Sequence, residues 1–209
     1  MAIVDIITKP KDCFLCINLP FSKEGFINDL KDESEKDFVK SIQRKHPYWD
    51  ADALWDNDYV KFINFFDSFE KQVKALGATI KRNFCLRDLN SIKQFDCFTP
   101  VAHWVKAKEK VELYDGLFTA SEFVEHIPPD YSGIIDLTIC YSDQLYDELK
   151  QKIRNCAIIA NYETTDLEIR LIIYKHTLKK LAFSNSFYID AQTKIYIDLL
   201  KNRKLLKHI

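Results

Sequence analysis

The sequence predicts a single α/β domain with a mainly parallel central sheet flanked by helices. Short apolar runs alternate with amphipathic stretches along the chain, which is the pattern of repeated strand–helix units. The first run, CFLCINL, is almost continuously apolar, as expected for a strand that is buried on both faces. The length of 209 residues suits one domain with its own core. We therefore expect residues 1–209 to fold as one unit.

The composition excludes several classes of partner. Charged residues make up 29% of the chain and the formal net charge is −1, so there is no basic excess to attract nucleic acid or anionic lipid. The opening MAIVDIITKP lacks the features of a signal peptide, and no apolar run is long enough to cross a membrane. These observations predict a cytoplasmic protein without nucleic-acid or membrane partners. They predict no particular oligomeric state.

The first half of the chain contains two predicted strands and one long helix. The apolar run 13–19 ends at a proline and forms the first strand. Residues 22–58 are rich in charge, and their apolar residues follow neither the helical nor the strand period for long. We therefore expect a partly helical insertion there. Apolar residues recur at helical spacing over 59–76, and Gly77 follows as a helix stop. A second strand is expected over 78–85.

The second half repeats the alternation of strands and helices. The helix after Asp115-Gly116 has Thr119 as its predicted N-cap, with Glu122 at capping-box spacing. The predicted elements are a short helix over 86–95, a strand over 97–104, a hairpin over 105–113, a turn and helix over 115–127, a strand over 133–140, a helix over 143–153, a strand over 156–162, and helices over 166–183 and 187–206.

The cysteines do not indicate a metal or cofactor site. A cytosolic chain is expected to keep its six cysteines as free thiols. Cys13 and Cys16 form a C-x-x-C pair, but no second Cys or His pair follows at zinc-site spacing, so we interpret both as buried strand residues. The four glycines do not form a phosphate-binding loop. We therefore predict no metal and no cofactor.

Two residues with suitable chemistry end predicted neighbouring strands. His103 ends the third strand, in FTPVAHW, and Cys140 ends the fourth, in GIIDLTICYS. Ligands of open α/β sheets bind beyond the carboxyl ends of the strands, so these are favoured positions for functional side chains. An imidazole next to a thiol can take its proton and create a nucleophilic thiolate. We expect a Cys-His dyad formed by Cys140 and His103 on adjacent parallel strands.

The other histidines are weaker candidates for the base. His46 lies in the predicted insertion, His126 at the end of a helix, His176 within an amphipathic helix and His208 at the carboxyl terminus. None of them ends a predicted strand, whereas His103 does. We therefore favour His103.

The segment that carries both residues resembles a known family. FDCFTPVAHW, followed by ELYDGLFTASEFVEHIPPDYSGIIDLTICYS, is similar to the core of a CHAT domain, a branch of the caspase-like cysteine peptidases. Asp115-Gly116-Leu117 and Thr119 match the turn and helix that separate the catalytic strands in that family. The resemblance covers about residues 78–162. It implies a caspase-like three-layer sandwich.

The resemblance also implies roles for individual residues. Cys140 would be the nucleophile of a cysteine endopeptidase, with His103 as general base and then general acid. Backbone N–H groups at Cys140 and near Trp104 would stabilise the oxyanion, and Thr138 and Asp136 would lie at the substrate pocket. The implied activity is limited cleavage of a protein partner, in a bacterial defence or signalling module.

Departures from the family pattern leave other functions open. Trp104 stands where relatives usually have glycine, and the caspase signature around the nucleophile is absent. Asp136 is equally consistent with a structural buried carboxylate. The main alternative is a peptidase-like interaction module without turnover, in which Trp104 or the acidic insertion occupies the cleft. A flavodoxin-like binder of small molecules is a weaker third interpretation because the glycine-rich loop is missing.

Overall fold

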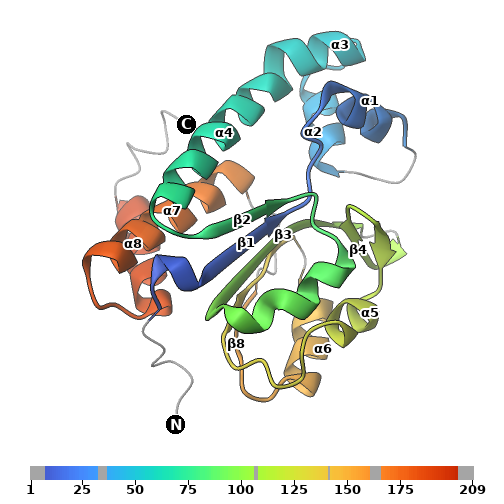
Figure 1. Cartoon of the computed structure of the whole chain (residues 1–209). Helices are drawn as coiled ribbons and strands as arrows, with labels where there is room; N and C mark the ends of the chain where they lie inside the picture. The colour runs from blue at the N-terminus through green and yellow to red at the C-terminus, as the bar shows by residue number, and fades with distance from the viewer. Residues whose placement is uncertain (1–7, 33–36, 106–107, 141, 161–165, 202–209) are drawn as a thin grey trace.

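The protein has a mixed α/β fold in which a curled, mixed sheet is flanked by helices (Figure 1). The computed structural model describes residues 8–32, 37–105, 108–140, 142–160 and 166–201. A short 3₁₀ turn, η2 (Pro10–Asp12), leads into β1 (Cys13–Ile17), every residue of which is buried. The predicted first strand is therefore confirmed, as are Cys13 and Cys16 as buried strand residues.

The centre of the sheet is parallel. Strand β1 lies between β2 (Thr79–Arg82) and β3 (Cys97–Val105), and it pairs parallel with both. Strand β3 also pairs parallel with two short strands, β6 (Ile134–Asp136) and β7 (Thr138–Ile139). The third and fourth predicted core strands are thus parallel neighbours, as the sequence indicated.

The remaining strands complete the sheet. Strand β8 (Ala157–Ile159) pairs parallel with β6. An antiparallel hairpin of β4 (Lys110–Leu113) and β5 (Gly116–Phe118) joins the last residues of β3. The sequence predicted a hairpin over 105–113, whereas β4 and β5 span 110–118, because Gly116–Phe118, which the sequence indicated only as a turn, forms a strand. The sheet is therefore mixed, because this hairpin adds two antiparallel pairings to the parallel centre.

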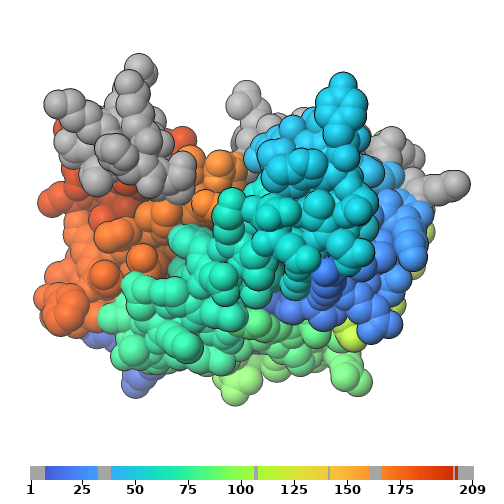
Figure 2. All heavy atoms as spheres, turned by 90° about the horizontal axis from the view of Figure 1, so that it is seen from above, coloured from blue at the N-terminus to red at the C-terminus, as the bar shows by residue number. Residues whose placement is uncertain are grey.

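Three long helices cover one face of the sheet. They are α4 (Val60–Ala75), α7 (Leu167–Phe183) and α8 (Tyr188–Lys201), and Figure 2 shows α4 and α7 side by side on this surface. Phe69 of α4 and Tyr174 of α7 meet in the core with ring centroids 6.4 Å apart. The helical spacing of apolar residues predicted α4 and α7 correctly because their buried faces pack on the sheet.

Shorter helices cover the other face. They are η4 (Leu86–Gln94), α5 (Ala120–Glu125) and α6 (Asp143–Lys152). Thr119 and Glu122 form the predicted capping box at the start of α5. Ser142 is the N-cap residue of α6, and its side chain makes no capping hydrogen bond. The two faces of the sheet thus have separate hydrophobic clusters.

The segment between β1 and α4 is helical over much of its length. It contains α1 (Lys23–Lys31), α2 (Asp37–Lys45), α3 (Ala51–Leu54) and the π-helical turn η3 (Trp55–Tyr59), which continues directly into α4. The rings of Phe26 and Tyr59 lie 4.5 Å apart and connect this segment to the core. These helices lie beyond the carboxyl end of β1 (Figure 1).

The fourth predicted strand is interrupted. Leu137 separates β6 from β7 and donates its backbone N–H to the carbonyl of Ile159, at 2.8 Å. Cys140 consequently lies in the turn that follows β7 instead of within a continuous strand. None of the helices in the described part of the chain is long and apolar enough to cross a membrane.

Candidate active site

The strand register places His103 and Cys140 at neighbouring positions. Val101 pairs with Thr138, and Ala102 pairs with Ile139 as the last parallel pair between β3 and β7. His103 is the next residue of β3, and Cys140 is the turn residue that directly follows β7. Neighbouring strands lie about 4.8 Å apart, so residues at matching positions can reach each other. The structure therefore brings the two predicted residues to the same edge of the sheet, on adjacent strands.

The backbone around His103 is held from two sides. His103 pairs with Glu112 across the β3–β4 hairpin. Asn18, the residue after β1, donates its backbone N–H to the carbonyl of Val101 at 2.9 Å and its side-chain amide to the carbonyl of Glu112 at 3.2 Å. Asn18 thus joins the end of β1 to both β3 and β4. The half-buried imidazole of His103 extends from this fixed backbone.

Trp104 is turned away from this side of the sheet. Its indole is buried in the hydrophobic cluster on the η4 face, together with Val111 and Leu137. Successive side chains of a strand point to opposite faces, so the His103 side chain leaves β3 on the other side. The indole of Trp104 therefore serves as a core residue and does not cover the His103 side of the strand.

A pocket of about 610 Å³ opens next to His103. It lies beyond the carboxyl ends of β1, β2 and β3, where parallel sheets commonly hold ligands. Helix α1 forms one wall and the β4–β5 hairpin another. His103 is part of the lining, whereas Cys140 is not. The pocket lining thus includes the predicted base but not the predicted nucleophile.

The pocket lining carries negative charge. Its acidic residues are Glu24, Asp29 and Asp32 from α1 and Glu112 from β4, and no lysine or arginine is among its described residues. Asn18 and Asn83, at the ends of β1 and β2, add amide groups. None of these residues was predicted from the sequence to belong to a site. Asn18 alone had a recognisable signal, because it is the polar residue in the apolar run CFLCINL.

The two residues predicted to contribute to substrate recognition lie outside this pocket. Thr138 is half-buried on β7. Asp136 is 2% exposed, and its Oδ2 accepts hydrogen bonds from the Tyr188 hydroxyl at 2.8 Å and the Gln192 amide at 2.5 Å. Burial raises the pKa of Asp136, while Arg170 and these hydrogen bonds oppose that shift. Asp136 is therefore a buried carboxylate that contacts α8.

Asp115 and Gly116 shape the hairpin next to the pocket. Both carboxylate oxygens of Asp115 lie 3.1 Å from the backbone N–H of Leu86, so Asp115 fixes the hairpin to the start of η4. Gly116 has φ 151°, in the region that favours glycine. Gly116 thus supplies the positive φ of this Asp-Gly turn, and Asp115 has a structural partner.

The other described histidines lie outside the pocket. His46 Nε2 is 3.2 Å from Asp58 Oδ2, and its ring stacks on Trp49 with centroids 4.0 Å apart. His126 Nδ1 is 2.9 Å from the Glu122 carbonyl. Burial lowers the pKa of His176. His208 lies outside the described residues.

The other thiols are in less reactive surroundings than a catalytic cysteine requires. Cys13, Cys16 and Cys97 are fully buried. Burial raises the pKa of Cys156 to about 12, and burial together with the carboxylates of Asp115 and Asp88 raises the pKa of Cys85. Since the thiolate is the reactive form, a raised pKa makes a thiol a poor nucleophile.

Comparisons of the chain with protein-family models, with curated proteins and with solved structures gave no match. Among the described residues, no three His, Cys, Asp or Glu side chains are grouped closely enough to hold a metal ion.

Proposed function

We propose that the protein is a cysteine endopeptidase of the caspase and CHAT type that makes limited cuts in a protein partner. One observation carries the proposal: His103 and Cys140 directly follow the last parallel pair of β3 and β7. A base and a thiol that directly follow the same parallel pair of adjacent strands form a suitable arrangement for nucleophilic catalysis. The pocket beside His103 offers space for a peptide.

The proposed chemistry is acyl transfer through the thiol. His103 takes the proton of the Cys140 thiol, and the thiolate attacks the carbonyl carbon of the scissile peptide bond. Backbone N–H groups at Cys140 and near Trp104 stabilise the resulting oxyanion. His103 then protonates the leaving amine, and water hydrolyses the Cys140 thioester to release the second product.

We also propose that the fold is a caspase-like three-layer sandwich. Helices on both faces of the sheet and the parallel pairings of β1, β2, β3, β6 and β8 support this assignment. The hairpin between the two proposed catalytic strands and the capped helix α5 follow the same order as in the family that the sequence resembles.

A survey of cleaved peptides tests the proposed activity. Wild type, Cys140→Ala and His103→Ala would each be incubated with a proteome, and new amino termini would be identified by mass spectrometry. We expect a small set of cuts with wild type only. Cys156→Ala is the matched control, because it removes another half-buried thiol and should retain the cuts. Identical peptide sets from wild type and Cys140→Ala would contradict the proposal.

A peptidase-like interaction module without turnover is the second candidate. The observation that favours it is the lining of the pocket, which includes His103 but not Cys140. A module of this kind would bind a partner through the pocket, and Cys140→Ala would leave that binding unchanged. Binding that depends on pocket residues, with no cuts by wild type, would support this function over the peptidase.

A further inference from the structure

The charge of the chain is unevenly distributed along its length. Residues 167–209, which begin with α7, contain nine lysines and arginines and three acidic residues. Residues 1–166 contain 21 lysines and arginines and 28 acidic residues. The formal net charge of −1 is therefore the sum of a basic segment and an otherwise acidic protein. Such an asymmetry indicates a surface that attracts anionic groups.

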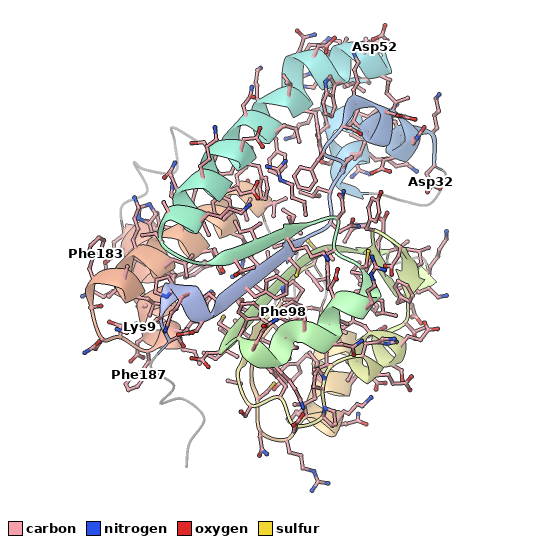
Figure 3. All side chains as sticks on the ribbon, in the orientation of Figure 1. Lys9, Asp32, Asp52, Phe98, Phe183 and Phe187 are labelled. Atoms are coloured by element: carbon pink, nitrogen blue, oxygen red, sulfur yellow. The ribbon has the colours of Figure 1, made fainter. Side chains whose placement is uncertain are left out.

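Helix α7 presents part of this basic charge along its outer side. The outer side, called the α7 stripe below, recurs at intervals of three or four residues and consists of Ile172, Lys175, His176, Lys179 and Phe183. His176 and Lys179 are exposed, and Lys175 is half-buried. Phe183, labelled in Figure 3 at the end of α7, is 86% exposed. The stripe thus combines positive charge with apolar surface.

The basic groups of the α7 stripe lack acidic partners. Within the described residues, no carboxylate forms an ion pair with Lys175, His176 or Lys179. Glu168, in the first turn, is the only acidic residue of α7. Desolvation and the ammonium of Lys179 lower the pKa of Lys175, and desolvation with both lysines lowers the pKa of His176. These neighbouring groups repel one another, and a bound anion would offset the repulsion.

Helix α8 adds a second pair of like charges. The side chain of Lys180, the residue after Lys179, contacts the side chain of Lys194 on α8. Desolvation and Lys194 lower the pKa of Lys180, whereas Asp198 and Asp190 of α8 act in the opposite direction. A carboxylate can accept hydrogen bonds from two ammonium groups at once, so it would replace this repulsion by attraction.

We propose that the α7 stripe, together with Lys180 and Lys194, docks a short acidic segment of a protein partner. Carboxylates of the segment would lie against the lysines, and its apolar side chains would pack on Ile172 and Phe183. The distance along the helix from Ile172 to Phe183 is about 17 Å, which about five residues of extended peptide would span. This inference goes beyond the proposed peptidase activity and does not depend on it.

The charge of the remaining chain favours a short peptide over a long polyanion. A nucleic acid or an anionic bilayer would extend past the α7 stripe, where the acidic excess of residues 1–166 would repel it. Single-stranded nucleic acid also binds by stacking successive bases on several aromatic rings, whereas the stripe has one ring, Phe183, at its end. A short acidic peptide would contact the basic surface alone.

Peptide binding, measured by fluorescence anisotropy, tests the inference. A short fluorescent peptide of glutamates and leucines would be compared with the same peptide in which glutamine replaces every glutamate. We expect the glutamate peptide to bind at least about tenfold more tightly, with the difference decreasing as salt is added. Equal affinities for the two peptides would overturn the inference.

Charge-removing variants locate the binding. Lys175→Gln with Lys179→Gln should weaken binding of the glutamate peptide by about fivefold, and glutamine keeps a helix propensity close to that of lysine. Lys150→Gln with Lys152→Gln is the matched control, because both lysines are exposed in the last turn of α6, on the other face of the sheet. An equal loss of affinity in the two double variants, with unfolding curves that show both are folded, would contradict this location.

Two further measurements test the apolar contact and the class of partner. Phe183→Ser should weaken binding of the glutamate peptide by about threefold and leave the unfolding curve unchanged, because the ring is exposed. Unchanged binding would contradict the packing of apolar side chains on Phe183. A single-stranded oligonucleotide that bound more tightly than the glutamate peptide at the same salt concentration would overturn the assignment of an acidic peptide as the ligand.

Discussion

The two ends of β3 have contrasting surroundings. At its start, Cys97 and Phe98 are 0% exposed, and parallel neighbours flank the strand on both sides, β1 through Cys13 and Phe14 and β6 through Ile134 and Ile135. Near its end, Ala102 and His103 are half-buried, although the last two residues, Trp104 and Val105, are buried again. One strand thus supplies both the centre of the core and the candidate base.

The difference arises from where the neighbouring strands stop. The parallel pairing with β1 ends at Val101 and the pairing with β7 ends at Ala102. From His103 onward β3 pairs with β4 of its own hairpin. The end of β3 is therefore outside the parallel sheet, where a side chain can reach a pocket and still keep a fixed backbone.

The largest expected effect is at the start of β3. Phe98, labelled in Figure 3, packs against Phe14 and Phe84 with ring centroids 6.0 Å apart in each pair. Phe98→Ala should lower the free energy of unfolding by about 3–5 kcal/mol, because it leaves a cavity in the core. His103→Ala should lower it by less than about 1 kcal/mol. Urea unfolding curves would measure the free energy of unfolding of both variants. Similar decreases in the two variants would refute the difference between the start of β3 and His103.

A second effect concerns pH and the neighbouring strand β6. Burial raises the pKa of Asp136, so the folded protein holds a proton that the unfolded chain releases. The free energy of unfolding should therefore decrease as the pH rises from the ordinary carboxyl pKa, about 4, to the raised pKa of Asp136 in the folded protein. Within that window the decrease is about 1.4 kcal/mol per pH unit. Asp136→Asn should flatten this slope in unfolding experiments. If the free energy of unfolding depended on pH equally in Asp136→Asn and in wild type, Asp136 would not be the group with the raised pKa.

A smaller effect is expected at the hairpin that extends the other end of β3. Asp115→Ala removes the carboxylate that accepts the Leu86 N–H, so unfolding should become easier by about 1 kcal/mol. Because Asp115 fixes the hairpin and contacts no proposed catalytic group in these hydrogen bonds, the labelling rate of Cys140 should change little. If Asp115→Ala kept the stability of wild type but Cys140 were no longer labelled, Asp115 would have a catalytic role instead.

The sequence predicted those parts of the fold that depend on local patterns. The apolar run of β1 and the helical spacing of α4 indicated their structures because each buries a face that its own residues define. The capping box of α5 was likewise local. The break at Leu137 was not predicted, because the run of residues 133–140 reads as one continuous apolar strand and the interruption has no local signal in it.

Local sequence patterns also predicted part of the candidate site. His103 and Cys140 were recognisable because each follows an apolar run, and the register makes them neighbours. The acidic lining from α1 was missed, because the sequence does not show that Glu24 and Asp32 face the hairpin of β4 and β5. The resemblance implied a place for Asp136 at the substrate pocket and left a structural buried carboxylate equally open, and the hydrogen bonds from Tyr188 and Gln192 of α8 hold this carboxylate in the core.

The reaction rate of the Cys140 thiol tests the proposed dyad most directly. Wild type and His103→Ala would be treated with a small alkylating reagent at neutral pH, and each cysteine would be followed by peptide mass spectrometry. We predict that Cys140 reacts faster than Cys85 and Cys156, whose raised pKa values slow them, and that His103→Ala slows Cys140 by about tenfold or more while the other two are unchanged. Equal Cys140 rates in both proteins would contradict the dyad.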